Sequence, residues 1–123
     1  MKKKILIIED EMSIRKALNE KFVLEGFDVV EAANGEIGLE VASKEKPDLI
    51  LLDIIMPYMD GVTFFKIFKK TEEGKDLPII ILSNLSDDEE VKKSLEGESC
   101  DYLIKSDWKI EDVVEKVKEK LGE

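Results

Sequence analysis

The strongest constraint on the fold is a short, unbroken apolar run that ends in a carboxylate. Residues Leu49 to Leu52 read Leu-Ile-Leu-Leu, and Asp53 follows directly. The run has the length of a strand and shows no alternation, so both of its faces should be covered, as in a parallel sheet flanked by helices. In open sheets of this kind, ligands bind beyond the carboxyl ends of the strands. The sequence therefore predicts that Asp53 lies at a functional edge.

The same pattern recurs along the chain, separated by segments with helical spacing. Further strands are predicted at Ile5–Ile8, around Val29–Val30, at Pro78–Leu82 and at Asp101–Ile104. A helical pattern follows each strand, and the helix predicted through Leu95 opens with a capping box of Ser86 and Glu89. Five strands alternating with five helices predict an α/β fold with a parallel sheet, formed by residues 1–123 as a single domain.

Local signals place two helix ends. Gly26 is predicted to end the first helix, because glycine is the usual residue at such a position. Asn34 and Gly35 would suit a hairpin turn, but Ile37 and Val41 continue with helical spacing. We therefore predict that Asn34 caps a helix.

The composition limits the classes of partner. The formal net charge is −10, so a polyanion such as DNA is repelled and direct binding of nucleic acid is not expected. The single cysteine, Cys100, excludes a disulfide within the chain, and there is no histidine to activate it as a nucleophile. Neither a signal peptide nor an apolar run of the ~20 residues that a membrane helix needs is recognised. We expect a cytoplasmic protein without membrane insertion, and the sequence leaves its oligomeric state open.

Polar side chains end four of the predicted strands. They are Glu9 and Asp10, Asp53, Ser83, and Lys105. Because parallel strands share a direction, these groups should meet at one edge of the sheet. Neighbouring carboxylates repel one another, and a hard divalent cation such as Mg²⁺, which prefers oxygen ligands, relieves that repulsion. With an amine and a hydroxyl as donors to an anion, the set meets the needs of phosphoryl transfer.

These residues resemble the receiver domain of two-component response regulators. The matching motifs are Glu9-Asp10, Asp53 with Met56-Pro57 and Asp60-Gly61, Ser83, and Tyr102 three residues before Lys105. They follow one another in the family's order between Ile5 and Leu121, which is nearly the whole chain. The resemblance implies a flavodoxin-like, doubly wound sheet of strand order 2-1-3-4-5, in a single domain similar to the chemotaxis regulators.

The resemblance also implies how the acids act. Asp53 would be the phosphoacceptor, taking a phosphoryl group from a histidine kinase or a small phosphodonor in a Mg²⁺-dependent reaction. Glu9, Asp10 and Asp53 would hold the Mg²⁺ together with the backbone carbonyl of Ile55. No other cofactor is implied.

A switch is implied at the ends of the last two strands. Lys105 would pair with Asp53 and then with its phosphoryl group. Ser83 would move toward the phosphoryl oxygens, and Tyr102 would change rotamer with it. The surface of helix four, strand five and helix five would then change for a downstream output protein or domain.

The implied protein acts only on itself, assisting its own phosphorylation and dephosphorylation, and is not an enzyme for an external substrate. Its phosphoryl donor would be a sensor histidine kinase or a phosphotransfer protein. An aspartate-dependent phosphatase is an alternative, but such enzymes place a second acid where Ile55 stands. A flavin carrier would want a glycine- or hydroxyl-rich loop in place of Glu9-Asp10-Glu11. A pseudo-receiver that works without phosphorylation would have no need of the intact polar set.

Four positions depart from the family pattern. Glu9 stands where aspartate is common, and Asn84 follows the switch hydroxyl where a small residue is common. Family members often carry Gly-Ala just before the last strand, and Gly97 lies about one place before that position. Ser106 follows Lys105 where the family often has a cis-proline. Because a cis bond before a residue other than proline costs about 3 kcal/mol, we predict a trans Lys105–Ser106 bond.

Overall fold

Strands and helices alternate along the chain, as the apolar runs predict. The computed structural model describes residues 2–54, 56–83, 101–104 and 109–122. In order, its elements are β1 (Lys4–Ile8), α1 (Met12–Leu24), β2 (Asp28–Ala32), α2 (Gly35–Glu45), β3 (Leu49–Asp53), α3 (Gly61–Lys69), β4 (Ile79–Ser83), β5 (Asp101–Ile104) and α5 (Ile110–Leu121). The predicted α/β class is confirmed. The helix predicted through Leu95 lies outside the described residues.

The strands form one parallel sheet in the order β2-β1-β3-β4-β5. This is the order that the resemblance implied. β3 occupies the centre, and all five of its residues are buried. Its apolar run is unbroken for the reason inferred from the sequence. Helices cover both faces of the sheet, so neither face needs polar residues.

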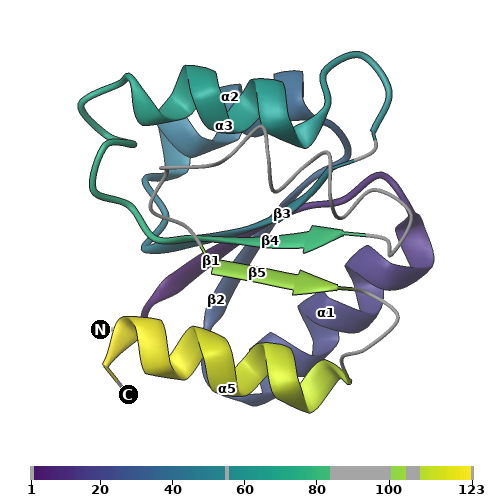
Figure 1. Ribbon diagram of the computed structural model, residues 1–123. Helices are drawn as coiled ribbons and strands as arrows, with labels where there is room; N and C mark the ends of the chain where they lie inside the picture. Colours follow the sequence, from purple (N-terminus) through teal and green to yellow (C-terminus); the bar gives the residue numbers. More distant parts are fainter. Residues whose placement is uncertain (1, 55, 84–100, 105–108, 123) are drawn as a thin grey trace.

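Two apolar layers hold the helices to the sheet (Figure 1). Helices α2 and α3 cover one face, where Phe64, Phe65 and Phe68 pack on Leu6, Ile50 and other strand residues. Helices α1 and α5 cover the other face, where Phe22 and Val113 pack on the alternate strand residues. Successive strand side chains point to opposite faces, so each strand contributes to both layers.

The helix ends follow the local signals with one small correction. The Asn34 side chain accepts a hydrogen bond from the Ile37 N–H at 2.9 Å, which confirms the predicted cap of α2. At the end of α1, Glu25 is the C-cap, and Gly26 follows it with a φ of +95°. Glycine is favoured there because it has no Cβ to resist a positive φ.

The described part of the chain contains no helix that is both long and apolar enough to span a bilayer.

Candidate phosphoacceptor and metal site

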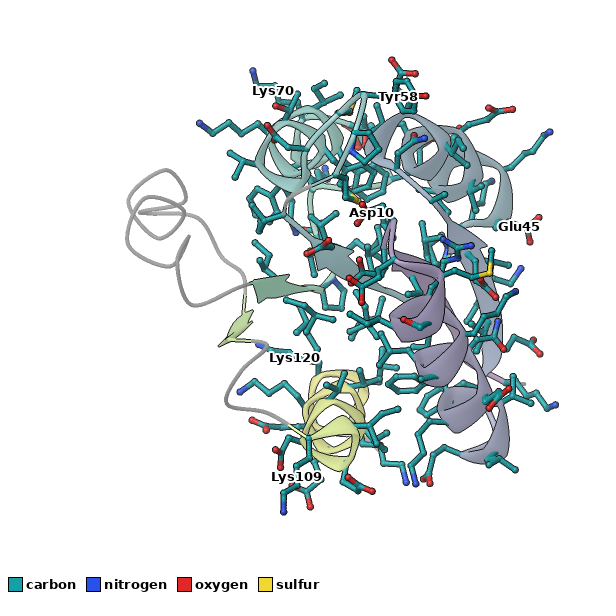
Figure 2. The ribbon with its side chains drawn as sticks, turned by 90° about the vertical axis from the view of Figure 1, so that its right-hand side faces the viewer. Asp10, Glu45, Tyr58, Lys70, Lys109 and Lys120 are labelled. Atoms are coloured by element: carbon teal, nitrogen blue, oxygen red, sulfur yellow. The ribbon has the colours of Figure 1, made fainter. Side chains whose placement is uncertain are left out.

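Strand register brings the predicted acids together. In the pairing of β1 with β3, Ile8 lies opposite Leu52, so the next residues lie side by side: Glu9 directly after β1 and Asp53 at the end of β3. In both strands the apolar run ends here at a charged residue. Figure 2 looks onto this edge of the sheet and shows Asp10 near its middle.

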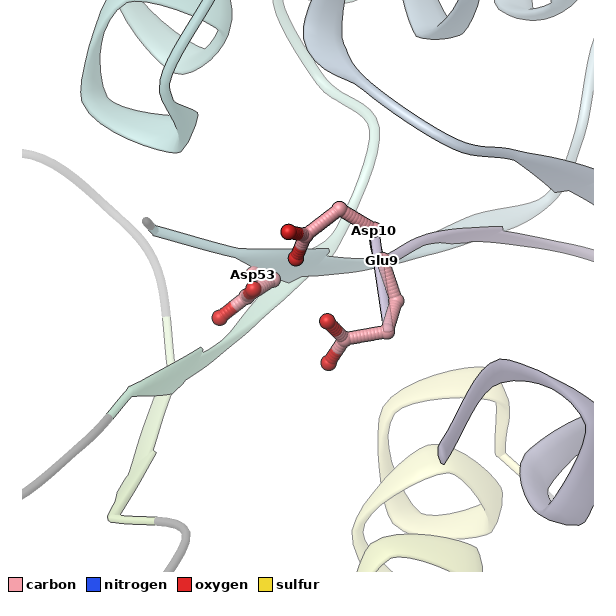
Figure 3. Close-up of side chains that lie close together, drawn as sticks. All are labelled: Glu9, Asp10 and Asp53. Atoms are coloured by element: carbon pink, nitrogen blue, oxygen red, sulfur yellow. The ribbon is translucent and has the colours of Figure 1, made fainter. Parts of the chain in front are cut away.

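Glu9, Asp10 and Asp53 form an acidic cluster (Figure 3). One carboxylate oxygen from each of these residues lies within 4.8 Å of one from each of the others. Glu9 and Asp53 are only 1% and 4% exposed, whereas Asp10 is exposed to solvent. Two buried carboxyl groups and one accessible group, all offering oxygen, form a donor set that suits Mg²⁺. The predicted convergence of these three acids is confirmed.

The backbone of Glu9 is tied down on both sides. Its N–H donates to the Ala32 carbonyl at 3.1 Å, and its own carbonyl accepts from Nη1 of Arg15 at 2.9 Å. Its carboxylate accepts from the Glu11 N–H at 3.2 Å. The segment that carries two of the three acids is therefore fixed to β2 and to the first turns of α1.

A second contact of Arg15, with the carboxylate of Glu31, holds its guanidinium beside Glu9. Its Nε donates to Oε1 of Glu31 at 2.7 Å, and Lys16 and Asn19 donate to the other oxygen of the same carboxylate. Burial alone would raise the pKa of Glu31, but the hydrogen bonds from Arg15, Lys16 and Asn19 outweigh it and hold that pKa below its ordinary value. Glu31 is therefore a well-satisfied carboxylate that holds the guanidinium in place.

The loop after β3 turns tightly against the phosphoacceptor candidate. Gly61 begins α3, and its N–H donates to the Ile54 carbonyl at 2.8 Å. A Cβ added at Gly61 would lie 2.1 Å from the backbone oxygen of Asp53. Asp60 caps the helix by accepting from the Thr63 N–H at 2.8 Å. The Asp60-Gly61 pair, which the sequence offered only as a family motif, is thus the start of α3 and sets the path of the backbone beyond Asp53.

The structure tests the other predicted site residues only in part. Ser83 is the last residue of β4, and it pairs with Ile104 at the end of β5. In the neighbouring pair of strands, Asp53 lies opposite Leu82, so the backbone of Ser83 is one step beyond the acceptor candidate. Tyr102 lies in β5 opposite Ile81. Ile55 and Lys105 lie outside the described residues.

Sequence reasoning missed Arg15, Glu31 and the packing role of Gly61. An arginine on an amphipathic helix usually belongs to its solvated face, and a glutamate in a short strand carries no spacing signal. Gly61 was recognised only as part of a motif. Each acts through a contact with a distant part of the chain, and local sequence does not display such contacts.

The whole-chain comparisons decide the family. The model of the response regulator receiver domain matches residues 5–118. The chain belongs to the response regulator receiver domain family. Sporulation initiation phosphotransferase F of Bacillus subtilis is 36% identical over 121 residues, covering 98% of this chain and 95% of that protein. Transcriptional regulatory protein AfsQ1 of Streptomyces coelicolor is 39% identical over 101 residues, covering 82% of this chain but 44% of that protein.

Solved structures agree with this family. The CheY-like response regulator receiver domain protein of Methanospirillum hungatei superposes with a TM-score of 0.89 at 27% identity, covering 99% of this chain and 95% of that one. Response regulator TrrA of Thermotoga maritima, in complex with Mg²⁺-BeF, superposes with a TM-score of 0.80 at 30% identity, covering 95% and 97%. The chain spans about two fifths of the length of several transcriptional regulators that it matches.

Proposed function

We propose that this receiver accepts a phosphoryl group on Asp53 in a Mg²⁺-dependent reaction and thereby acts as a phosphorylation-activated response regulator. The observation that carries the proposal is the acidic cluster: Asp53, 4% exposed at the end of β3, has oxygens of Glu9 and Asp10 within 4.8 Å. Membership of the receiver family and the Mg²⁺-BeF complex of the TrrA relative support the same function.

The metal would be held by Glu9, Asp10 and Asp53, with the carbonyl of Ile55 as the further ligand implied by the family. When bound, Mg²⁺ supplies positive charge that offsets the charge on the phosphoryl oxygens. The protein contributes the fixed positions of the acids. Asp10, the exposed member, leaves this set open to solvent and to a phosphodonor.

The chemical step is a displacement at phosphorus. A carboxylate oxygen of Asp53 forms a new O–P bond while the P–N bond of a phosphohistidine, or the P–O bond of a small donor such as acetyl phosphate, breaks and its electron pair leaves with the donor. The product is an aspartyl phosphate. Water attack at the same phosphorus regenerates the carboxylate and releases inorganic phosphate, so the protein acts as a catalyst on itself alone.

The remaining roles extend this proposal to signalling. We assign the phosphoryl contacts to Lys105 and Ser83 and the coupled rotamer change to Tyr102. The surface of helix four, strand five and helix five, which the resemblance implies as the output surface, would pass the signal to an output protein or domain. The donor would be a sensor histidine kinase or a phosphotransfer protein in the cytoplasm, and residues 1–123 would act as one receiver domain.

Phosphorylation by acetyl phosphate tests the proposal. Intact-protein mass spectrometry after incubation with acetyl phosphate and Mg²⁺ should show one added phosphoryl group that alkali removes. Asp53→Asn should abolish it, because an amide is not a nucleophile here. Asp60→Asn is the matched control, since asparagine caps α3 as well as aspartate does, and it should label like the wild type. An unlabelled wild type would favour a pseudo-receiver, and a labelled Asp53→Asn would place the acceptor elsewhere.

A further inference from the structure

Arg15 makes two directed contacts that join different parts of the fold. Its Nη1 donates to the Glu9 carbonyl at 2.9 Å, and its Nε donates to the Glu31 carboxylate at 2.7 Å. The side chain is only 13% exposed although it lies on α1, a helix at the surface. A guanidinium presents its donors in a rigid fork, so these two contacts together fix its plane.

Glu31 is a firm anchor for that fork. It lies in β2, where it pairs with Ile7 of β1, one strand away from β3. Its carboxylate also accepts from Lys16 at 3.2 Å and from Asn19. Glu31 is therefore held by the sheet and by two other side chains of α1, and its position does not depend on the acidic cluster.

The contact with Glu9 bears on the site through the peptide bond. The carbonyl that Arg15 holds belongs to the planar unit that joins Glu9 to Asp10. The other peptide unit of Glu9 donates its N–H to the Ala32 carbonyl at 3.1 Å. With both units held, the Cα atoms that carry two of the three acids of the cluster are fixed relative to β1 and β2.

We propose that Arg15 is a positioning residue, which holds the Glu9–Asp10 peptide so that both carboxylates face Asp53 and bind a divalent cation together. This inference rests on the proposed function of the acidic cluster. Glu31 has two parts in it: it orients the guanidinium, and its negative charge offsets a positive charge that would otherwise oppose a cation at the neighbouring site.

The electrostatic and the positioning effects of Arg15 have opposite signs, so an experiment can separate them. If its charge were its main effect, removing it would tighten the binding of a cation. If its geometry is what counts, both Arg15→Met and Arg15→Lys should weaken binding, because a lysine keeps the charge but cannot donate to two acceptors from a fixed fork. Loss of a group that orients metal ligands commonly lowers affinity about 10- to 100-fold.

The experiment is a titration with Mg²⁺ alone, followed by the NMR shifts of the Asp10 and Glu11 amides and by calorimetry. The control is Lys16→Met, which removes the same charge and a contact to the same Glu31 carboxylate without touching the Glu9 backbone. We expect Arg15→Lys and Arg15→Met to bind Mg²⁺ about tenfold more weakly than the wild type. Lys16→Met should show no weakening.

Three outcomes would overturn the inference. They are wild-type affinity in Arg15→Lys, tighter binding in Arg15→Met, and equal weakening in Lys16→Met. The stability of each variant is measured on the same samples. A substitution with only a structural effect lowers the stability but leaves the Mg²⁺ affinity of the folded protein unchanged. A wild type that binds no Mg²⁺ would instead remove the proposed cation site itself, which is a different failure. Arg15→Lys alone decides the matter if Arg15→Met does not fold.

Discussion

Replacing Gly61 by alanine should destabilise the fold and disturb the site at once. The new Cβ would lie 2.1 Å from the Asp53 carbonyl oxygen and 2.9 Å from the Ile54 Cα, where ordinary contacts are 3.4–4 Å. All of these atoms are backbone, so no side-chain rotation relieves the clash, and α3 must move away from the end of β3. Overpacking costs about 1–3 kcal/mol. Loss of the Gly61 N–H bond to Ile54 adds about 1 kcal/mol.

The expected total is about 2–4 kcal/mol, a large part of the 5–15 kcal/mol typical of a domain. Urea unfolding followed by circular dichroism measures the loss, and the rate of labelling by acetyl phosphate measures the disturbance of Asp53. Gly26→Ala is the control: its φ is +95° but its Cβ would meet nothing within 4 Å. It should cost about 1–2 kcal/mol through backbone strain and leave the labelling rate unchanged. Wild-type stability and labelling in Gly61→Ala would refute the packing argument.

Three further changes test other parts of the account. Mg²⁺ at a hundredfold excess over its Kd should raise the free energy of unfolding by about 2.7 kcal/mol; Asp10→Asn should gain little, and an undiminished gain would remove Asp10 from the site. The pKa of Glu31 is lowered because its hydrogen bonds outweigh burial, so its ion pairs stabilise the fold above pH 4.5 and lose that effect as the pH falls through the lowered pKa. The difference in stability between the wild type and Glu31→Gln should therefore disappear in acid, and a difference independent of pH would contradict this. Tyr58 has a φ of +68° and is 83% exposed, so Tyr58→Asn should gain about 1 kcal/mol in urea unfolding, and a loss would mean that the ring makes a stabilising contact.

The sheet could be predicted because its strands carry a strong signal. Runs such as Ile5–Ile8 and Leu49–Leu52 are apolar throughout and end at a charge, a pattern that suits a strand buried on both faces. The site followed from the sheet, because parallel register alone brings Glu9, directly after β1, beside Asp53, the last residue of β3. Boundaries were predicted less accurately: the strand predicted at Pro78–Leu82 is β4, which spans Ile79–Ser83.

What could not be predicted depends on contacts between distant segments. Arg15 and Glu31 are 16 residues apart, and each resembles an ordinary surface charge until β2 is placed beside β1. The need for glycine at position 61 arises from the Asp53 carbonyl, not from an unusual φ. Ile55, Lys105 and Ser106 lie outside the described residues. The roles given to Ile55 and Lys105, and the trans Lys105–Ser106 bond, therefore stay predictions.

The most direct test of the central claim identifies the phosphorylated residue chemically. Protein labelled with acetyl phosphate and Mg²⁺ is treated with borohydride, which reduces an acyl phosphate to an alcohol, and is then digested and sequenced by mass spectrometry. The account predicts homoserine at position 53 and intact aspartate at positions 10 and 60. Homoserine at position 10 or 60, or a phosphorylated protein without homoserine at position 53, would contradict it.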